Sequence, residues 1–296
     1  MEAIIETKNL TKRFSSKIAV NKVNMHICKK DIYGLIGKNG AGKTTIMKLL
    51  LGLNRPTEGE ISLFGGAELT KERKKIGSLI ENPGLYKNCT AYENMVRFSI
   101  LYGASKEEIQ PILDMVGLGD TGSKKAGEFS LGMRQRLGIA IALLSHPEVL
   151  ILDEPINGLD PAGIREIRDI ILRLNQEGVT FLISSHLLDE LAKVVTKYGI
   201  IADGRLLEEI TAAELQQRCC KYVRIVCSDA QKALMILQNN FVNVKASIQQ
   251  ECIHLASHFD RTAQINTLLV QSGISVSELI MNEGGFEEYF IERLGK

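Results

Sequence analysis

The apolar positions of the chain fall into short continuous runs and longer helical patterns that follow one another in turn. Three continuous runs, at residues 31–36, 149–152 and 179–184, predict strands buried on both faces, as in a parallel sheet. Apolar residues at helical spacing follow the first run over 45–51 and the second over 164–174. This order predicts an α/β fold with a mainly parallel sheet and flanking helices.

Two pairs of segments predict antiparallel strands. Apolar and polar residues alternate over 4–10 and 22–27, which predicts an N-terminal antiparallel β subdomain with residues 12–17 as its turn. Asp203-Gly204 predicts a hairpin between 198–202 and 205–207. We expect the first domain to span residues 1–210.

A helical stretch separates the first two buried runs. Helices are expected near 91–102, 106–116 and 131–145, with a kink or a late start at Pro111 in the second. Because strands frame this stretch, it predicts a helical subdomain at about residues 82–145.

Beyond residue 211 the pattern changes to a βαββαβ order. This order predicts a small α+β accessory domain of the ferredoxin-like type over 211–296. The alternating and helical segments succeed one another over 221–227, 230–239, 242–248, 252–256, 261–272 and 275–281. A last helix is expected to carry Phe286, Tyr289, Phe290 and Leu294.

Composition describes an ordinary globular protein. The chain has 296 residues, of which 45% are hydrophobic and 24% charged, and its net charge of +1 gives no general attraction to nucleic acid. No apolar run is long enough to span a bilayer and the first residues lack a signal-peptide pattern, so we expect a cytosolic chain without direct membrane insertion. The six cysteines form no CxxC pair and are expected to be reduced.

Residues Gly37–Thr44 fit the phosphate-loop pattern between a strand and a helix. Glycines let the backbone approach phosphates, so that consecutive N–H groups and the helix N-terminus face the anion. Lys43 is expected to reach the terminal phosphates and Thr44 to place its hydroxyl on Mg²⁺. A glycine-rich turn without a ligand is the alternative, but eight positions and both flanks agree with the motif. The expected nucleotide contacts are Gly37, Lys38, Asn39, Gly40, Ala41, Gly42, Lys43, Thr44 and Thr45.

Two acidic residues end the second buried strand. Asp153 is placed to hold Mg²⁺ through water together with Thr44, and Glu154 to polarise a water for in-line attack on a γ-phosphate. Seen alone, an acidic pair at a strand end is more often a plain strand boundary. The phosphate loop upstream in the same sheet favours the functional interpretation.

Two further side chains are candidates for nucleotide contact. His186 follows the third buried strand, at the sheet edge where α/β proteins bind ligands, and is suited to hydrogen-bond the γ-phosphate. An ordinary loop histidine is the alternative. Phe14 lies at a turn ahead of the phosphate loop, where it is suited to stack on a purine, although alone it is more simply a half-buried turn residue.

A second helix start lies at Ser130. The serine is suited to cap the helix, and Gly132 leaves backbone N–H groups uncovered, which together make a second candidate anion-binding site. Physical reasoning alone favours a plain cap.

Together these segments resemble the ATP-binding subunit of ABC transporters over residues 3–210. Gly37–Thr44 resembles its Walker A motif, Leu150–Glu154 its Walker B motif with the catalytic glutamate, and Asn157–Asp160 its D-loop. The resemblance therefore implies a P-loop NTPase core that binds ATP and Mg²⁺.

Four residues outside these motifs match other functional positions of the family. His186 resembles the switch histidine, and Phe14 the aromatic residue that stacks on adenine. Ser130 and Gly132 match the signature motif, which in this family completes the site of a partner subunit.

The match has two departures. The signature, usually Leu-Ser-Gly-Gly-Gln, reads Phe129-Ser130-Leu131-Gly132-Met133, a form similar to drug-resistance exporters of the bacitracin type. Glu81 replaces the Q-loop glutamine, and its carboxylate is suited to face Mg²⁺ and to couple the nucleotide state to the helical subdomain. This acidic loop and the extra C-terminal region resemble the lantibiotic self-protection exporters.

The resemblance implies an ATPase that works as a homodimer or pseudo-dimer on a permease with transmembrane helices, at the inner face of the cell membrane. ATP held by one subunit would be capped by Ser130 and Gly132 of the other, and catalysis would rest on Glu154, His186 and Lys43. The implied role is export of an antimicrobial peptide, bacitracin-like or lantibiotic, for resistance or self-protection. Export of another drug or a lipid-like substrate is the alternative.

Three other functions are alternatives to this one. An ABC-type ATPase acting on chromosomes or ribosomes would carry long coiled coils, zinc modules or a second phosphate loop, none of which is visible in the sequence. A P-loop kinase or GTPase would need an acceptor pocket or an Asn-Lys-x-Asp element, which Asn54–Thr57 does not fit. A non-catalytic nucleotide sensor would bind ATP without turnover.

Overall fold

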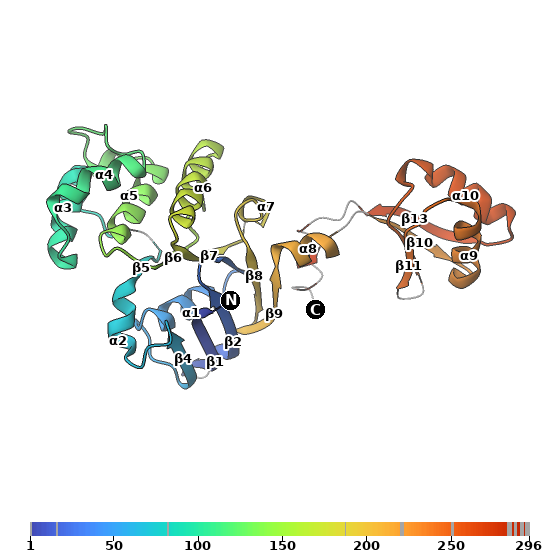
Figure 1. Cartoon of the computed structure of the whole chain (residues 1–296), viewed down its shortest axis with the longest axis horizontal. Coiled ribbons are helices and arrows are strands. Elements are labelled where there is room, and N and C mark those ends of the chain that lie inside the picture. The colour runs from blue at the N-terminus through green and yellow to red at the C-terminus, as the bar shows by residue number, and fades with distance from the viewer. Residues whose placement is uncertain are drawn as a thin grey trace. The chain divides into compact units, whose positions relative to one another are not determined.

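The chain divides into two compact units, Met1–Ala212 with Arg293–Lys296 and Ala213–Glu292 (Figure 1). Each unit has its own hydrophobic core. The computed structural model describes residues 2–15, 17–81, 83–186, 188–219, 222–249 and 252–282, together with Phe286, Tyr289, Phe290 and Arg293.

A six-stranded sheet runs through the first unit. Its strands are β3 (Ile32–Ile36), β5 (Ile76–Leu79), β6 (Val149–Asp153), β7 (Thr180–Ser185), β8 (Lys197–Ala202) and β9 (Arg205–Thr211). They lie in the order β5-β6-β7-β3-β8-β9, and all neighbours are parallel except β8 and β9, which form the predicted hairpin. Every residue of β3, β6 and β7 is buried, as their continuous apolar runs predict.

The carboxyl ends of three neighbouring strands meet at one edge of this sheet. Because β7 lies between β6 and β3, the residue pairs Asp153–Ser184 and Ile36–Ser185 stand side by side in the parallel register. The segment that follows each strand therefore emerges at the same edge.

A smaller antiparallel sheet consists of β1 (Ala3–Phe14), β2 (Lys17–Cys28) and β4 (Glu58–Leu63), in the order β2-β1-β4. The turn predicted over 12–17 is wrong in its extent, because the hairpin continues until Phe14 pairs with Lys17. Register shifts between Thr7 and Arg13 interrupt the alternation of apolar and polar residues. Because of these shifts, the alternation of apolar and polar residues does not show where β1 ends.

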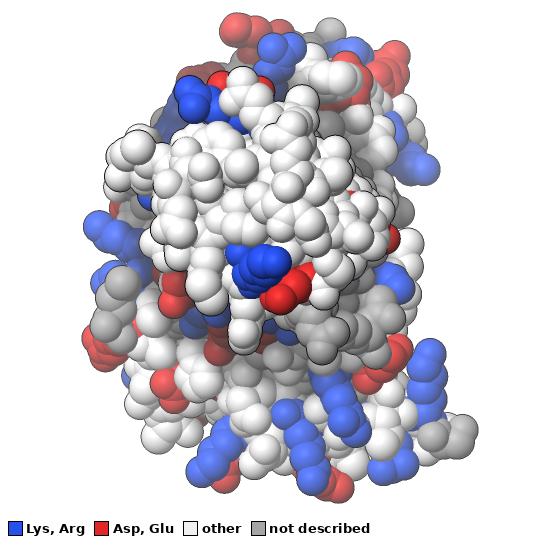
Figure 2. All heavy atoms as spheres, turned by 90° about the vertical axis from the view of Figure 1, so that its right-hand side faces the viewer, with Lys and Arg blue, Asp and Glu red and all other residues white. Residues whose placement is uncertain are grey.

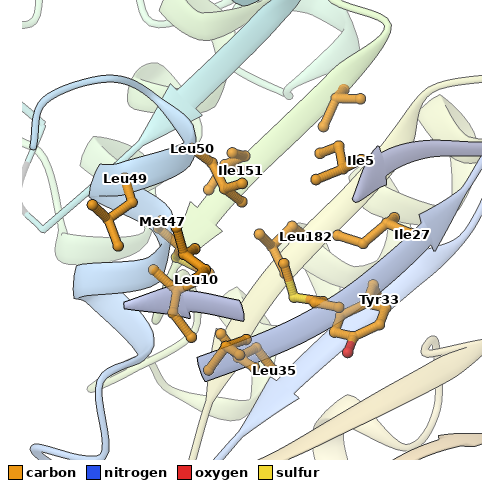
Figure 3. Packing of buried hydrophobic residues seen from close by; sticks show 14 of the residues in the cluster. Ile5, Leu10, Ile27, Tyr33, Leu35, Met47, Leu49, Leu50, Ile151 and Leu182 are labelled. Carbon is orange, nitrogen blue, oxygen red and sulfur yellow. The ribbon is translucent and has the colours of Figure 1, made fainter. Parts of the chain in front are cut away.

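Apolar side chains of both sheets pack with α1 (Lys43–Leu50) in the core shown in Figure 3. The packing fixes the helix that begins at the phosphate loop. The small sheet contributes Ile5, Leu10 and Ile27, the helix Met47, Leu49 and Leu50, and the large sheet Tyr33, Leu35, Ile151 and Leu182.

Three helices, α3 (Ala91–Tyr102), α4 (Ile109–Met115) and α5 (Leu131–Leu143), make up the helical stretch between β5 and β6. A 3₁₀ turn at Lys106–Glu108 precedes α4, so the α-helix starts late, as Pro111 predicts. Pro111 is the third residue of α4, where its missing N–H removes no intrahelical hydrogen bond. The remaining helices of the first unit and its boundary are α2 (Leu69–Glu72), α6 (Pro161–Gln176), α7 (Leu188–Leu191) and α8 (Ala212–Arg218).

The second unit has the βαββαβ order that the sequence predicts. Its elements are β10 (Tyr222–Cys227), α9 (Ala230–Asn240), β11 (Ala246–Gln249), β12 (Cys252–Leu255), α10 (Thr262–Gln271) and β13 (Val276–Asn282). They form an antiparallel sheet in the order β11-β12-β10-β13. The strand predicted from residue 242 starts later, because a turn with Asn243 at a φ of 59° follows α9.

The expected last helix lies partly outside the described residues, Leu294 included. Tyr289 and Phe290 are helical, and Phe290 is buried.

The face of the second unit in Figure 2 carries few charged side chains. In this unit α10 contains no Asp, Glu, Lys or Arg, and Lys232 is the one such residue of α9.

Among the helices of the described residues, none is both long and apolar enough to cross a membrane.

Candidate active site

The loop between β3 and α1 encloses the side chain of Lys43. Its Nζ donates to the carbonyl oxygen of Gly37 at 2.7 Å, and the side chain is 6% exposed. Gly42 caps α1 with a φ of 110°, and a Cβ there would lie 2.6 Å from the Ala19 carbonyl oxygen, so this position requires glycine. A Cβ on Gly37 would lie 2.3 Å from the Ile201 carbonyl oxygen. The first N–H groups of α1 have no partner within the helix, so this helix start is suited to bind an anion.

A cavity of about 400 Å³ opens at this loop. It brings the end of β1 together with the start of α1 and the end of β6. Phe14, 45% exposed, is the aromatic residue of its wall. The lining residues are Phe14, Lys17, Ala19, Asn39, Gly40, Gly42, Lys43, Thr44, Thr45 and Glu154.

Hydrogen bonds fix both oxygens of the Asp153 carboxylate. Thr44 Oγ1 donates to Oδ2 at 2.7 Å, and Ser184 Oγ donates to Oδ1 at 2.6 Å. The backbone N–H of Glu154 donates to the same Ser184 Oγ at 2.9 Å. Mg²⁺ prefers oxygen ligands, and the convergence of the Thr44 hydroxyl with an oriented carboxylate fits such an ion.

Glu154 lies between the side chains of Lys43 and His186, which belong to two neighbouring segments. Its Oε1 is 3.3 Å from Lys43 Nζ, and its Oε2 is 2.8 Å from His186 Nδ1. The backbone of Glu154 has a φ of 49°, a left-handed conformation that is uncommon for a residue with a side chain and often found at functional sites. This turn directs Glu154 to the phosphate loop while Asp153 stays in the strand.

Ser130 and Gly132 begin α5 and do not line the cavity. Ser130 is the N-cap, as predicted, and its Oγ accepts from the Met133 N–H at 3.2 Å. A Cβ built on Gly132 would lie 3.8 Å from both Gly163 and Leu159, so the start of α5 packs next to the start of α6.

Glu81 forms an ion pair with Lys48 of α1, with 2.7 Å between Oε1 and Nζ. The hydrogen bond from Lys48 holds the pKa of the Glu81 carboxyl below its usual value. This contact joins the segment after β5 to the phosphate-loop helix, one turn beyond Thr44. The expected role of Glu81 at Mg²⁺ stays a prediction.

Comparisons with known proteins show the family to which this chain belongs. The sequence profile of the family described as "ABC transporter" matches residues 20–157. The bacitracin transport ATP-binding protein BcrA of Bacillus licheniformis is 43% identical over 301 residues, which cover 100% of this chain and 98% of that protein. This chain belongs to the ABC transporter family. As a member of the family's ATP-binding subunits, it is an ATPase that powers transport, and the P-loop kinase and GTPase alternatives no longer apply.

Two other ABC proteins extend the comparison. The lantibiotic transport ATP-binding protein SrtF of Streptococcus pyogenes is 47% identical over 206 residues, which cover 70% of this chain and 90% of that protein. A dimeric structure of the ATP-binding cassette MJ0796, in a post-hydrolysis state bound to ADP and Pi, matches with a TM-score of 0.62 and 25% identity. The match covers 70% of this chain and 98% of that one. It confirms the expected fold class.

Sequence reasoning missed several residues at this ABC site. Lys17 and Ala19 reach the cavity because the hairpin pairs β2 with the end of β1. Ser184 reaches Asp153 because the two residues are partners in the parallel register of β6 and β7. Knowledge of this register, which the order of the buried runs does not supply, would have been needed to find Ser184.

We expect Ser184→Ala to lower the free energy of unfolding by about 1–3 kcal/mol. Ser184 is fully buried, and its loss leaves the N–H of Glu154 without its acceptor and one Asp153 oxygen without its donor. Urea denaturation measures the change. Ser78→Ala, at an exposed position of β5, is the control and should differ little from the unsubstituted chain. Equal stability of the two variants would contradict the prediction.

Proposed function

We propose that this ATPase powers an exporter of peptide antibiotics of the bacitracin or lantibiotic type. One observation supports ATP binding by this chain: Phe14, the phosphate loop and Glu154 line the same cavity. The names of BcrA and SrtF support the substrate class.

ATP fits the cavity in one direction. Its purine stacks on Phe14 at the end of β1, and its phosphates lie on the loop and the N-terminus of α1. Lys43 then contacts the terminal phosphates. The cavity has an aromatic side chain, Phe14, in one part of its wall and Lys43 with the N–H groups of the phosphate loop in another. These positions support an ATP molecule with its purine at Phe14 and its phosphates at the loop.

Thr44 and Asp153 would hold Mg²⁺, whose charge neutralises the phosphate oxygens during transfer. Ser184 keeps the carboxylate turned toward Thr44 through its hydrogen bond. Glu81 would join this group after leaving Lys48.

Glu154 acts as the base that orients the attacking water. Its present partners, Lys43 and His186, are the two residues that the γ-phosphate would engage. Phosphate binding therefore offers Lys43 a stronger partner and frees Oε1 of Glu154 for water. His186 bridges Glu154 and the phosphate.

Two copies of the chain close over two ATP molecules. Ser130 and Gly132 form a capped helix start that does not line its own subunit's cavity, and Gly132 presents no side chain to an approaching anion. The dimeric structure of the MJ0796 cassette supports the formation of a dimer. ATP closes the dimer, and hydrolysis opens it.

The dimer works with a permease that carries transmembrane helices, at the inner face of the membrane. The segment around Glu81 couples the nucleotide state to the helical subdomain, which we propose spans about residues 82–145 of an ATP-binding domain at 1–210. Residues 211–296 form an accessory domain.

The test is ATP hydrolysis by the complex of this chain with its permease in lipid vesicles. We expect bacitracin or a lantibiotic to stimulate turnover severalfold, because a transported peptide favours the closed, hydrolysing dimer. A complex carrying Lys43→Ala is the control and should show no stimulation. Stimulation by an unrelated drug or a lipid-like compound, with none by either peptide, would contradict the substrate class and favour the second candidate.

A further inference from the structure

The cation Lys12 lies against the aromatic wall of the nucleotide cavity. Its Nζ is 4.9 Å from the centroid of the Phe14 ring, within the range of a cation–π contact. Phe14 lines the cavity and Lys12 does not. The Phe14 ring therefore contacts the ammonium of Lys12 and also forms part of the cavity wall.

The loop between α1 and β4 anchors Lys12. Its Nζ donates to the carbonyl oxygen of Arg55 at 2.8 Å. Two more bonds join the same loop to the end of β1, from Arg13 N to Thr57 Oγ1 at 3.0 Å and from Thr57 N to Thr11 O at 2.8 Å. The ammonium is thus held in place by backbone that is itself fixed to the strand.

We propose that Lys12 is a positioning residue for the purine of ATP, which it serves through the ring of Phe14. This inference rests on the proposed placement of the purine on Phe14. An exposed aromatic side chain loses rotamer freedom when a ligand stacks on it, and a cation held over one face of the ring reduces this loss by orienting the ring beforehand. The ammonium also draws π-electron density toward itself, which weakens the repulsion between the opposite face and the electron-rich purine.

The sequence contains a matched control for this effect. Lys8 lies on the same strand and is exposed, but it does not line the nucleotide cavity. Lys12→Met removes the ammonium while keeping a long side chain, and Lys12→Arg keeps a cation that also binds aromatic faces. Lys8→Met makes the same chemical change away from the ring.

The experiment measures equilibrium binding of ATP and of inorganic triphosphate to the full chain. We expect Lys12→Met to weaken ATP binding about two- to fivefold, the range for an exposed cation–π contact, and to leave triphosphate binding unchanged. Lys12→Arg should restore ATP binding, and Lys8→Met should bind both ligands as the unsubstituted chain does. Thermal unfolding of each variant shows whether it is folded.

A second background separates this inference from the proposed function. In a Phe14→Ala chain, Lys12→Met should have no further effect on ATP binding. Equal losses for ATP and triphosphate, or the same loss in both backgrounds, would overturn the role of Lys12. If Phe14→Ala itself leaves ATP binding unchanged, the proposed purine site is wrong. If Phe14→Ala weakens binding and Lys12→Met does not, only the role of Lys12 is wrong.

Discussion

Glu154→Gln is expected to slow ATP hydrolysis by about 10²- to 10⁴-fold, the usual contribution of a general base. Glutamine keeps the size of the side chain but does not take up the proton of the attacking water. ATP binding should be preserved or tighter, because the γ-phosphate no longer competes with a carboxylate 3.3 Å from Lys43 Nζ. Phosphate release and equilibrium dialysis measure the two quantities.

Glu148→Gln is the matched control, since Glu148 is exposed and directly precedes β6. It should hydrolyse ATP at the unsubstituted rate. Hydrolysis at that rate by the Glu154→Gln chain would show that another group is the base.

Lys43→Ala should weaken ATP binding by roughly 10- to 150-fold, which corresponds to the loss of a hydrogen bond to a charged group. The effect is large because the Lys43 side chain is 6% exposed and its ammonium is already held at the phosphate loop, so ATP binding requires little further ordering of this side chain. Titration with a fluorescent ATP analogue gives the affinity.

The control for this change is Lys29→Ala, an exposed lysine before β3. It should leave ATP affinity within error of the unsubstituted chain. Similar affinities for the two alanine variants, both folded by thermal unfolding, would exclude Lys43 from phosphate binding.

The sheet edge that carries the candidate site was predictable, because strands of a parallel sheet appear in the sequence as continuous apolar runs. Once β3, β6 and β7 are recognised, their carboxyl ends bring the phosphate loop, Asp153, Glu154 and His186 to one edge. This prediction needs only the order and direction of the strands, not the positions of side chains.

Contacts that depend on register or on distant segments were not predictable. The bulged end of β1 conceals the pairing of Phe14 with Lys17, and Ser184 becomes a partner of Asp153 only in one register. The ion pair of Glu81 with Lys48 joins residues 33 positions apart in the sequence. Helix α1 packs beside β6, and β6 is the neighbour of β5 in the sheet, so Lys48 comes close to the segment after β5 only in the folded chain.

A crystal structure of the Glu154→Gln protein with MgATP tests most directly whether two copies of the chain share each ATP site. The account predicts a dimer in which Ser130 of the partner subunit lies within hydrogen-bonding distance of the γ-phosphate that Lys43 contacts. A structure with ATP bound at Lys43 and Ser130 remote from every triphosphate would contradict it.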